Sequence, residues 1–92
     1  MEAITQHAII RMQQRGIKES TLYCLLKFGS KKRCNRGCFM MFFDKHARNR
    51  LQKLVDSNLY IFLQSQFDAY AIVSTSGEVL TVGHRFKKIT RH

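Results

Sequence analysis

The sequence predicts an α+β domain in which N-terminal helices pack on one face of a mostly antiparallel four-stranded sheet, with one extra helix inserted. Two observations support this prediction. Apolar residues recur at helical spacing in the first third of the chain, and most of the last third alternates apolar and polar residues as strands do. With 92 residues and no internal repeat or linker, the chain is expected to form a single domain over residues 1–92 with a shallow functional site.

Two helices are expected at the start of the chain. The hydroxyl of Thr5 is suited to cap a first helix that runs to about Arg15, and Gly16 is placed to end it. A second helix is expected over residues 19–28, where leucines occupy the i, i+3 and i+4 positions of one face, and Gly29 follows it at C′. These helices would form the layer that packs on the sheet.

The middle of the chain is expected to form a loop, a strand and a helix. Residues 30–37 are strongly basic and are predicted to be a surface loop. Residues 38–43 are apolar and aromatic, which favours a short strand. Asp44 is suited to cap a third helix over about residues 45–55, which is the inserted helix.

Strands are expected in the rest of the chain. Residues 59–63 are apolar and predict a strand, with a helical turn as the alternative. Residues 69–75 and 78–85 both alternate, and the Ser76-Gly77 pair between them is a turn signal. The last two strands are therefore expected to form an antiparallel hairpin.

The charge balance indicates the class of partner. The chain carries 16 Lys and Arg against 6 Asp and Glu, a net charge of +10. Because six acidic residues can pair with at most six cations, at least ten cations lack an acidic partner. A polyanion is the natural counter-surface, so RNA is the expected partner, with DNA as the alternative. An acidic protein would satisfy the same charges, so charge alone does not choose between them.

No segment predicts contact with a membrane. The longest apolar run, residues 38–43, is far shorter than the ~18 residues of a membrane span. The N-terminus lacks the charged-then-apolar pattern of a secretion signal. We therefore expect a cytoplasmic protein.

The cysteines do not predict a disulfide framework or a strong metal site. Cys24, Cys34 and Cys38 are expected to be reduced thiols, with Cys24 in the core. The C-x3-C spacing of Cys34 and Cys38, taken with His46, is a weak zinc pattern because it lacks a second matching pair. We therefore expect no metal and no cofactor.

The first candidate site is one face of the first helix. His7, Arg11 and Arg15 lie at i, i+4 and i+8 on this face. The two arginines repel each other by a few tenths of a kcal/mol, roughly, and an anion lying across the face would relieve that repulsion. His7 falls in the first turn, where the helix dipole disfavours a protonated ring, as a general base requires.

The second candidate site is the basic C-terminus. By strand alternation Arg85 falls on the same side as Thr81, while His84 falls with Val82. A bulge at Gly83 would return His84 to the polar side, so His84 stays a candidate. Tyr70 and Phe86 are candidate platforms on which RNA bases could stack. The further cations assigned to nucleic-acid binding are Lys45, Arg48, Lys87, Lys88 and Arg91.

Three motifs carry a resemblance to a known family. Residues 7–17, with the pattern H-A-x-x-R-M-x-x-R-G-I, resemble the opening of the bacterial domain-of-unknown-function family 4258. Residues 76–85, S-G-E-V-L-T-V-G-H-R, resemble the closing hairpin of that family. Residues 43–51, F-D-K-x-A-R-x-R-L, resemble one of its subgroups.

That family is grouped with the RelE/ParE-like toxin superfamily. The resemblance implies helices on one face of an antiparallel sheet and a basic opposite face that meets RNA. RelE-like members cleave mRNA without a metal, using basic side chains and sometimes a His, Glu or Tyr near the C-terminus. ParE-like members share the fold but inhibit gyrase, so the fold does not settle the function.

The resemblance also extends to an arrangement of side chains. Nucleases of the barnase, EndoU and colicin type set a helix-borne His against strand-borne Arg, Lys and Thr, and His7, Arg85 and Thr81 would match that arrangement. Neither end motif offers an acidic residue resembling a catalytic Glu, other than Glu78 at the turn. This difference from the family pattern counts against a mechanism in which a carboxylate is the general base.

These observations predict a metal-independent, RNA-binding endoribonuclease of toxin–antitoxin type. His7 or His84 would take the proton of the 2′-OH, and Arg11, Arg15 and Arg85 would bind the phosphate and stabilise its growing charge. The alternative is a RelE/ParE-like binding module without catalysis, as a gyrase inhibitor or a nucleic-acid adaptor. An acidic antitoxin fits either function, and the sequence leaves a homodimer and the RNA substrate open.

Overall fold

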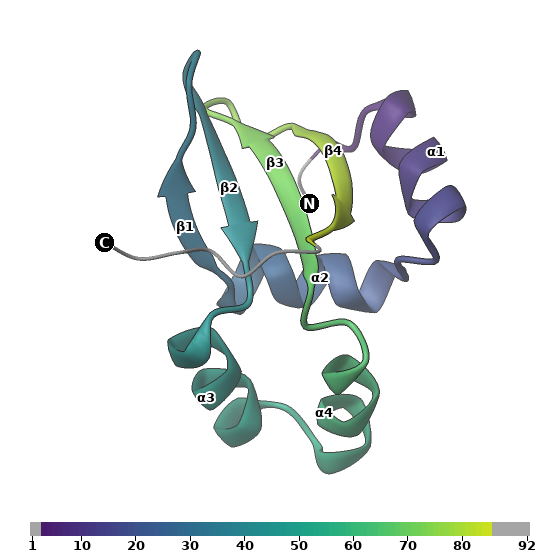
Figure 1. Ribbon diagram of the computed structural model, residues 1–92, viewed down its shortest axis with the longest axis vertical. Coiled ribbons are helices and arrows are strands. Elements are labelled where there is room, and N and C mark those ends of the chain that lie inside the picture. The colour runs from purple at the N-terminus through teal and green to yellow at the C-terminus, as the bar shows by residue number, and fades with distance from the viewer. Residues whose placement is uncertain (1–2, 86–92) are drawn as a thin grey trace.

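The computed structural model describes residues 3–85 and shows an α+β fold with four helices and a four-stranded antiparallel sheet (Figure 1). The strands lie in the sheet in the order β1-β2-β3-β4. The elements are α1 (Gln6–Arg15), α2 (Glu19–Phe28), β1 (Ser30–Arg33), β2 (Cys38–Phe42), α3 (Lys45–Leu54), α4 (Ser57–Gln64), β3 (Ala69–Ser74) and β4 (Val79–His84). The predicted fold class is thus confirmed.

Helix α1 is anchored to the last strand at its first turn. The Thr5 hydroxyl accepts the Ala8 N–H at 3.1 Å and donates to the Leu80 carbonyl at 3.1 Å. The backbone before α1 pairs with Val79 through two hydrogen bonds, Thr5 N–H to its carbonyl (3.0 Å) and Val79 N–H to the Ala3 carbonyl (2.8 Å). Gly16 ends the helix at φ 66°. Both predicted ends are confirmed, and α1 lies beside β4 (Figure 1).

The core lies between the helices and one face of the sheet. Leu25 of α2 and Leu51 of α3 are fully buried in it, together with Phe43 after β2. Cys24 is also buried, as predicted. Within the described residues, none of the helices combines the length and apolarity of a membrane span.

The two faces of the sheet differ in what covers them. Ala69 and Ala71 of β3 and Val82 of β4 are buried in the core beside α2. The opposite face carries none of the helices of residues 3–85 (Figure 1), and we call it the helix-free face. It is formed by Met40, Phe42, Tyr70, Ile72, Thr81 and Gly83.

A bulge in β4 sets which side chains reach each face. Ile72 opposes Thr81 but Val73 opposes Val79, so Leu80 is the extra residue. The bulge lets both Val79 and Val82 enter the core and keeps Thr81 on the helix-free face. It lies at Leu80, and the bulge considered at Gly83 is not found there.

The prediction of a loop over residues 30–37 is wrong for its first half. Ser30–Arg33 forms β1, which pairs with β2 in a register that sets Ser30 opposite Phe42. As the edge strand, β1 needs hydrogen bonds on one side only, and its charged side chains remain exposed. A strand with so few apolar residues has no periodicity to reveal it.

The prediction of a strand over residues 59–63 is also wrong, because these residues lie in α4. The Asp56 carboxylate caps that helix by accepting the Leu59 N–H at 2.7 Å. Leu59 and Leu63 then fall one turn apart and both contact the core. The insertion between β2 and β3 therefore holds two helices where the sequence predicted one.

Candidate nucleic-acid interface

Helix α1 places two arginines beside the helix-free face. The helix runs alongside β4, from the hydrogen bond between Thr5 and Leu80 to a hydrogen bond between the Arg15 carbonyl and His84. Between the two elements lies a shallow cleft of about 200 Å³. It is lined by Arg11, Arg15, Tyr70, Thr81, Val82, Gly83 and His84.

Tyr70 enters this cleft because Gly83 has no side chain. The two residues face each other across β3 and β4. A Cβ atom at position 83 would lie 2.9 Å from the Tyr70 hydroxyl and 3.0 Å from its ring. The ring therefore lies over the β4 backbone at Gly83, and Tyr70 lines the cleft together with Arg11 and Arg15.

The ring of His84 is held between two acceptors. Nδ1 lies 2.8 Å from an Asp68 carboxylate oxygen, and Nε2 lies 2.8 Å from the Arg15 carbonyl. Both ring nitrogens must donate to satisfy these contacts, which requires the protonated imidazolium. Partial burial lowers the pKa of His84, but the hydrogen bonds to Arg15 and Asp68 and the Asp68 charge outweigh it, so the pKa is raised.

His84 therefore fixes the end of α1 against β4. A general base needs a free nitrogen, and both nitrogens of His84 already bind protein atoms. The geometry assigns His84 the role of holding Arg15 in place rather than that of a base.

His7 lies at the opposite end of α1. It is exposed and is not among the residues that line the cleft. Arg15 lies eight positions further along the helix, a rise of about 12 Å. The structure thus brings Arg11, Arg15, Thr81 and His84 together but leaves the two predicted imidazoles apart.

Arg85 is a cation with unused donors. Its guanidinium lies over the Phe42 ring at 4.9 Å from the centroid. Its Nε and Nη1 atoms are buried and have no hydrogen-bond partner within residues 3–85. Burial lowers the pKa of Arg85, and the neighbouring Arg48 adds to this, while Asp68 and Asp44 oppose it.

The other predicted binding residues fall in two groups. Arg48 of α3 stacks over Phe67 at 5.7 Å and is close enough to Arg85 to act on its pKa, whereas Lys45 is exposed at the start of α3. The remaining predicted residues lie outside the described part of the chain: Phe86, Lys87, Lys88 and Arg91.

The three residues of the weak zinc pattern do not lie together in the structure. Cys34 and Cys38 face each other at one end of β2, while His46 lies on α3, which begins beyond the other end of that strand. Within residues 3–85, no three His, Cys, Asp or Glu side chains are placed to hold a metal ion.

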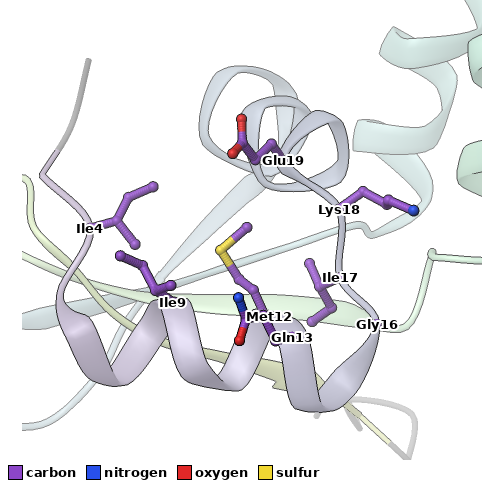
Figure 2. Close-up of a pocket in the computed structure, with 8 residues that line it drawn as sticks. All are labelled: Ile4, Ile9, Met12, Gln13, Gly16, Ile17, Lys18 and Glu19. Carbon is purple, nitrogen blue, oxygen red and sulfur yellow. The ribbon is translucent and has the colours of Figure 1, made fainter.

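A larger hollow of about 450 Å³ lies between α1 and the start of α2. Figure 2 shows Ile4, Ile9, Met12 and Ile17 around it. Among its lining residues only Lys18 and Glu19 are charged, and their charges are opposite. Its apolar lining does not suit a polyanion, and the arginines of the cleft are not among its residues.

Sequence reasoning missed Asp68 and Phe42. Asp68 binds the ring of His84, and its carbonyl accepts the Arg85 N–H at 2.7 Å. The hairpin prediction contained a signal, since pairing outward from the turn brings residue 68 opposite residue 85. No comparable signal marked Phe42, which sits in a wholly apolar run.

In comparisons with known proteins, the chain matches no family model, no curated protein and no solved structure.

Proposed function

We propose that the protein binds single-stranded RNA on the helix-free face, with Arg11, Arg15 and Arg85 taking phosphate groups. Arg85 is the observation that supports this most directly. Two buried N–H donors of a permanently charged group have no acceptor within residues 3–85, and each unsatisfied donor costs roughly 1–3 kcal/mol. Phosphate oxygens are acceptors that a guanidinium binds well.

The aromatic side chains of this face favour a single strand over a duplex. Tyr70 is half-buried on this face and opposes Phe42, which is buried and lies under the Arg85 guanidinium. An unpaired base can stack on an accessible ring such as that of Tyr70, whereas duplex DNA is read by an element that protrudes into a groove. The cations therefore lie beside a surface that offers contacts to bases as well as to phosphates.

Binding of a labelled oligoribonucleotide, followed by fluorescence anisotropy at low salt, tests the proposal. Arg85→Gln should weaken binding by about tenfold to a hundredfold, because a charge-assisted contact contributes about 1.5–3 kcal/mol. The matched control is Lys53→Gln, which removes an exposed cation in the last turn of α3, and it should bind as the parent does. An equal loss of RNA affinity in both variants would show that RNA is attracted by the overall positive charge and not by a defined site, and would contradict the proposal.

Cleavage of the bound RNA is the second part of the proposal. The cleft combines two arginines with the Tyr70 hydroxyl and Thr81, groups that can stabilise charge growing on a phosphate without a metal. His7 lies one turn before Arg11 on the same helix face, about 5–6 Å away between Cβ atoms. A phosphate held by Arg11 would thus bring a ribose 2′-OH within reach of the His7 ring, which would act as the base.

Incubation of the purified protein with RNA in the presence of a chelator tests this chemistry. We expect fragments that end in a cyclic phosphate, because attack by the 2′-OH produces that group. His7→Ala should slow cleavage about a hundredfold or more. His46→Ala is the matched control, since His46 is exposed on α3, and it should cut as the parent does. The nuclease proposal fails if a His7→Ala, His84→Ala double variant cuts RNA as fast as the parent.

A binding module without catalysis remains the alternative. It would bind RNA or DNA with strong salt dependence and yield no fragments. Arg11 and Arg15 form no salt bridge with an acidic side chain of the described chain, so an acidic antitoxin could cover the same cations. Co-purification with such a protein, released by high salt, would identify that partner.

A further inference from the structure

Two cysteines face each other across the hairpin of β1 and β2. Arg33 opposes Phe39 in the ladder, so Cys34 and Cys38 form the next pair toward the turn. The Cys34 N–H donates to the Cys38 carbonyl at 2.8 Å. Directly opposed residues of antiparallel strands have Cα atoms roughly 4.5–5.5 Å apart, which lies within the range of a disulfide.

The two side chains also lie close together. Cys38 is near enough to act on the Cys34 thiol, and the Cys38 thiol donates to the Asn35 carbonyl at 3.0 Å. Both residues are half-buried and carry free thiols. Burial raises the pKa of Cys34, the nearby Cys38 adds to this, and the Lys32 charge opposes it.

We infer that Cys34 and Cys38 are a redox-active dithiol, which a small anionic disulfide oxidises to an intramolecular disulfide. Oxidised glutathione serves as the probe for this class of reagent. The hairpin attracts such a reagent because Lys32 lies close enough to act on the Cys34 thiol, and Lys31, Arg33 and Arg36 add positive charge to the same hairpin. Cys38 shares the β2 side of Met40 and Phe42, so the disulfide would lie at the end of the helix-free face. The inference does not depend on RNA binding.

The reaction takes place in two thiol–disulfide exchanges. One cysteine loses its proton to solvent, and its thiolate attacks the small disulfide, which forms a mixed disulfide and releases one small thiolate. The second cysteine, as a thiolate, attacks the protein sulfur of the mixed disulfide and releases the other small thiolate. The protein gives up two electrons and two protons, and the small disulfide is reduced to two thiols.

Cys24 provides an internal comparison within the same chain. Its residue is 1% exposed, and burial raises the pKa of its thiol. Because burial also raises the pKa of Cys34, the contrast rests on access, and the reagent cannot reach a thiol enclosed in the core. Cys24 should therefore remain reduced under conditions that oxidise the hairpin pair.

The purified protein is incubated with mixtures of reduced and oxidised glutathione, quenched by an alkylating reagent and analysed by mass spectrometry. We expect a species lighter by two hydrogens, with Cys34 and Cys38 joined and Cys24 alkylated after unfolding. Cys34→Ser and Cys38→Ser should each retain one glutathione adduct, because the second exchange lacks its thiol. Glutathione adducts on the parent without an internal bond, or disulfide-linked dimers in its place, would overturn the inference.

The charge of the hairpin is tested separately by a change of reagent. Lys32→Gln with Arg36→Gln should slow oxidation by anionic oxidised glutathione severalfold at low salt. The rate with uncharged hydroxyethyl disulfide should stay near that of the parent. If both reagents slow equally, the cations act on the thiols rather than attracting the reagent, and the preference for an anionic disulfide is refuted.

Discussion

The atoms that face the ring of His84 favour its doubly protonated form and raise its pKa. Asp68 and the Arg15 carbonyl are both acceptors, so the neutral ring, which has a single N–H, leaves one contact unmade. The proton thereby joins three parts of the chain: the end of α1, the segment before β3, and the end of β4. Its loss should loosen the wall of the cleft that carries Arg15.

The contribution of His84 to stability should depend on pH with a definite sign. Its pKa is raised in the folded protein, so its stabilisation is complete below the unfolded pKa of about 6.5 and disappears as pH rises through the folded value. His84→Ala should lower the free energy of unfolding by about 1–2 kcal/mol in mild acid and by less in mild alkali. Urea denaturation followed by circular dichroism measures both. A difference that grows with pH would contradict the protonated contact, and His46→Ala serves as control.

Gly83 should matter for the position of Tyr70 more than for stability. Gly83→Ala brings a Cβ atom to 2.9 Å from the Tyr70 hydroxyl, and the outer end of that flexible side chain must move. We expect the free energy of unfolding to change by less than about 1 kcal/mol. RNA affinity should fall by as much as in Tyr70→Ala. Unchanged affinity in Gly83→Ala alone would show that Tyr70 need not lie over β4.

At the scale of elements, two glycines that follow helices have different reasons to be glycine. Gly16 has φ 66° and open space around its Cβ position, so only the left-handed backbone conformation favours glycine there. Gly29 has φ −65°, but a Cβ atom there would lie 2.4 Å from the Leu25 carbonyl oxygen. The sequence predicted that both helices end at these residues, yet only contact with the backbone explains Gly29.

Alanine substitutions should separate these two reasons. Gly16→Ala should cost roughly 1–2 kcal/mol, the strain of a left-handed residue with a side chain. Gly29→Ala should cost more, about 3 kcal/mol, because backbone of α2 must shift. Thermal unfolding of the two variants side by side measures this order. A smaller loss for Gly29→Ala than for Gly16→Ala would contradict the close approach.

Elements that signal their own ends were predictable, and those defined by their neighbours were not. Thr5 and Asp44 mark helix starts through caps that need only local sequence. β1 exists because β2 pairs with it, and α4 depends on a core that receives Leu59 and Leu63. The candidate site divides in the same way. The spacing along one helix face predicted Arg11 and Arg15, whereas the contact between His84 and Asp68 is formed by the tertiary fold.

At the scale of the whole molecule, the positive charge should determine how binding responds to salt. A single strand loses affinity with a log–log slope of about −0.7 per phosphate contact, so six contacts give about −4. Arg11→Gln with Arg15→Gln should make the slope shallower by about 1.4. Titrations of labelled RNA at increasing salt measure this. Lys53→Gln should leave the slope unchanged, and a slope equally steep in the double variant would place the contacts elsewhere.

The hydrogen bond between Thr5 and Leu80 joins residues 75 positions apart. During synthesis, α1 leaves the ribosome well before β4, the strand against which it packs. A nascent chain therefore carries its arginines without the wall that completes their cleft. The cleft that we propose to bind RNA is therefore complete only after β4 has been synthesised.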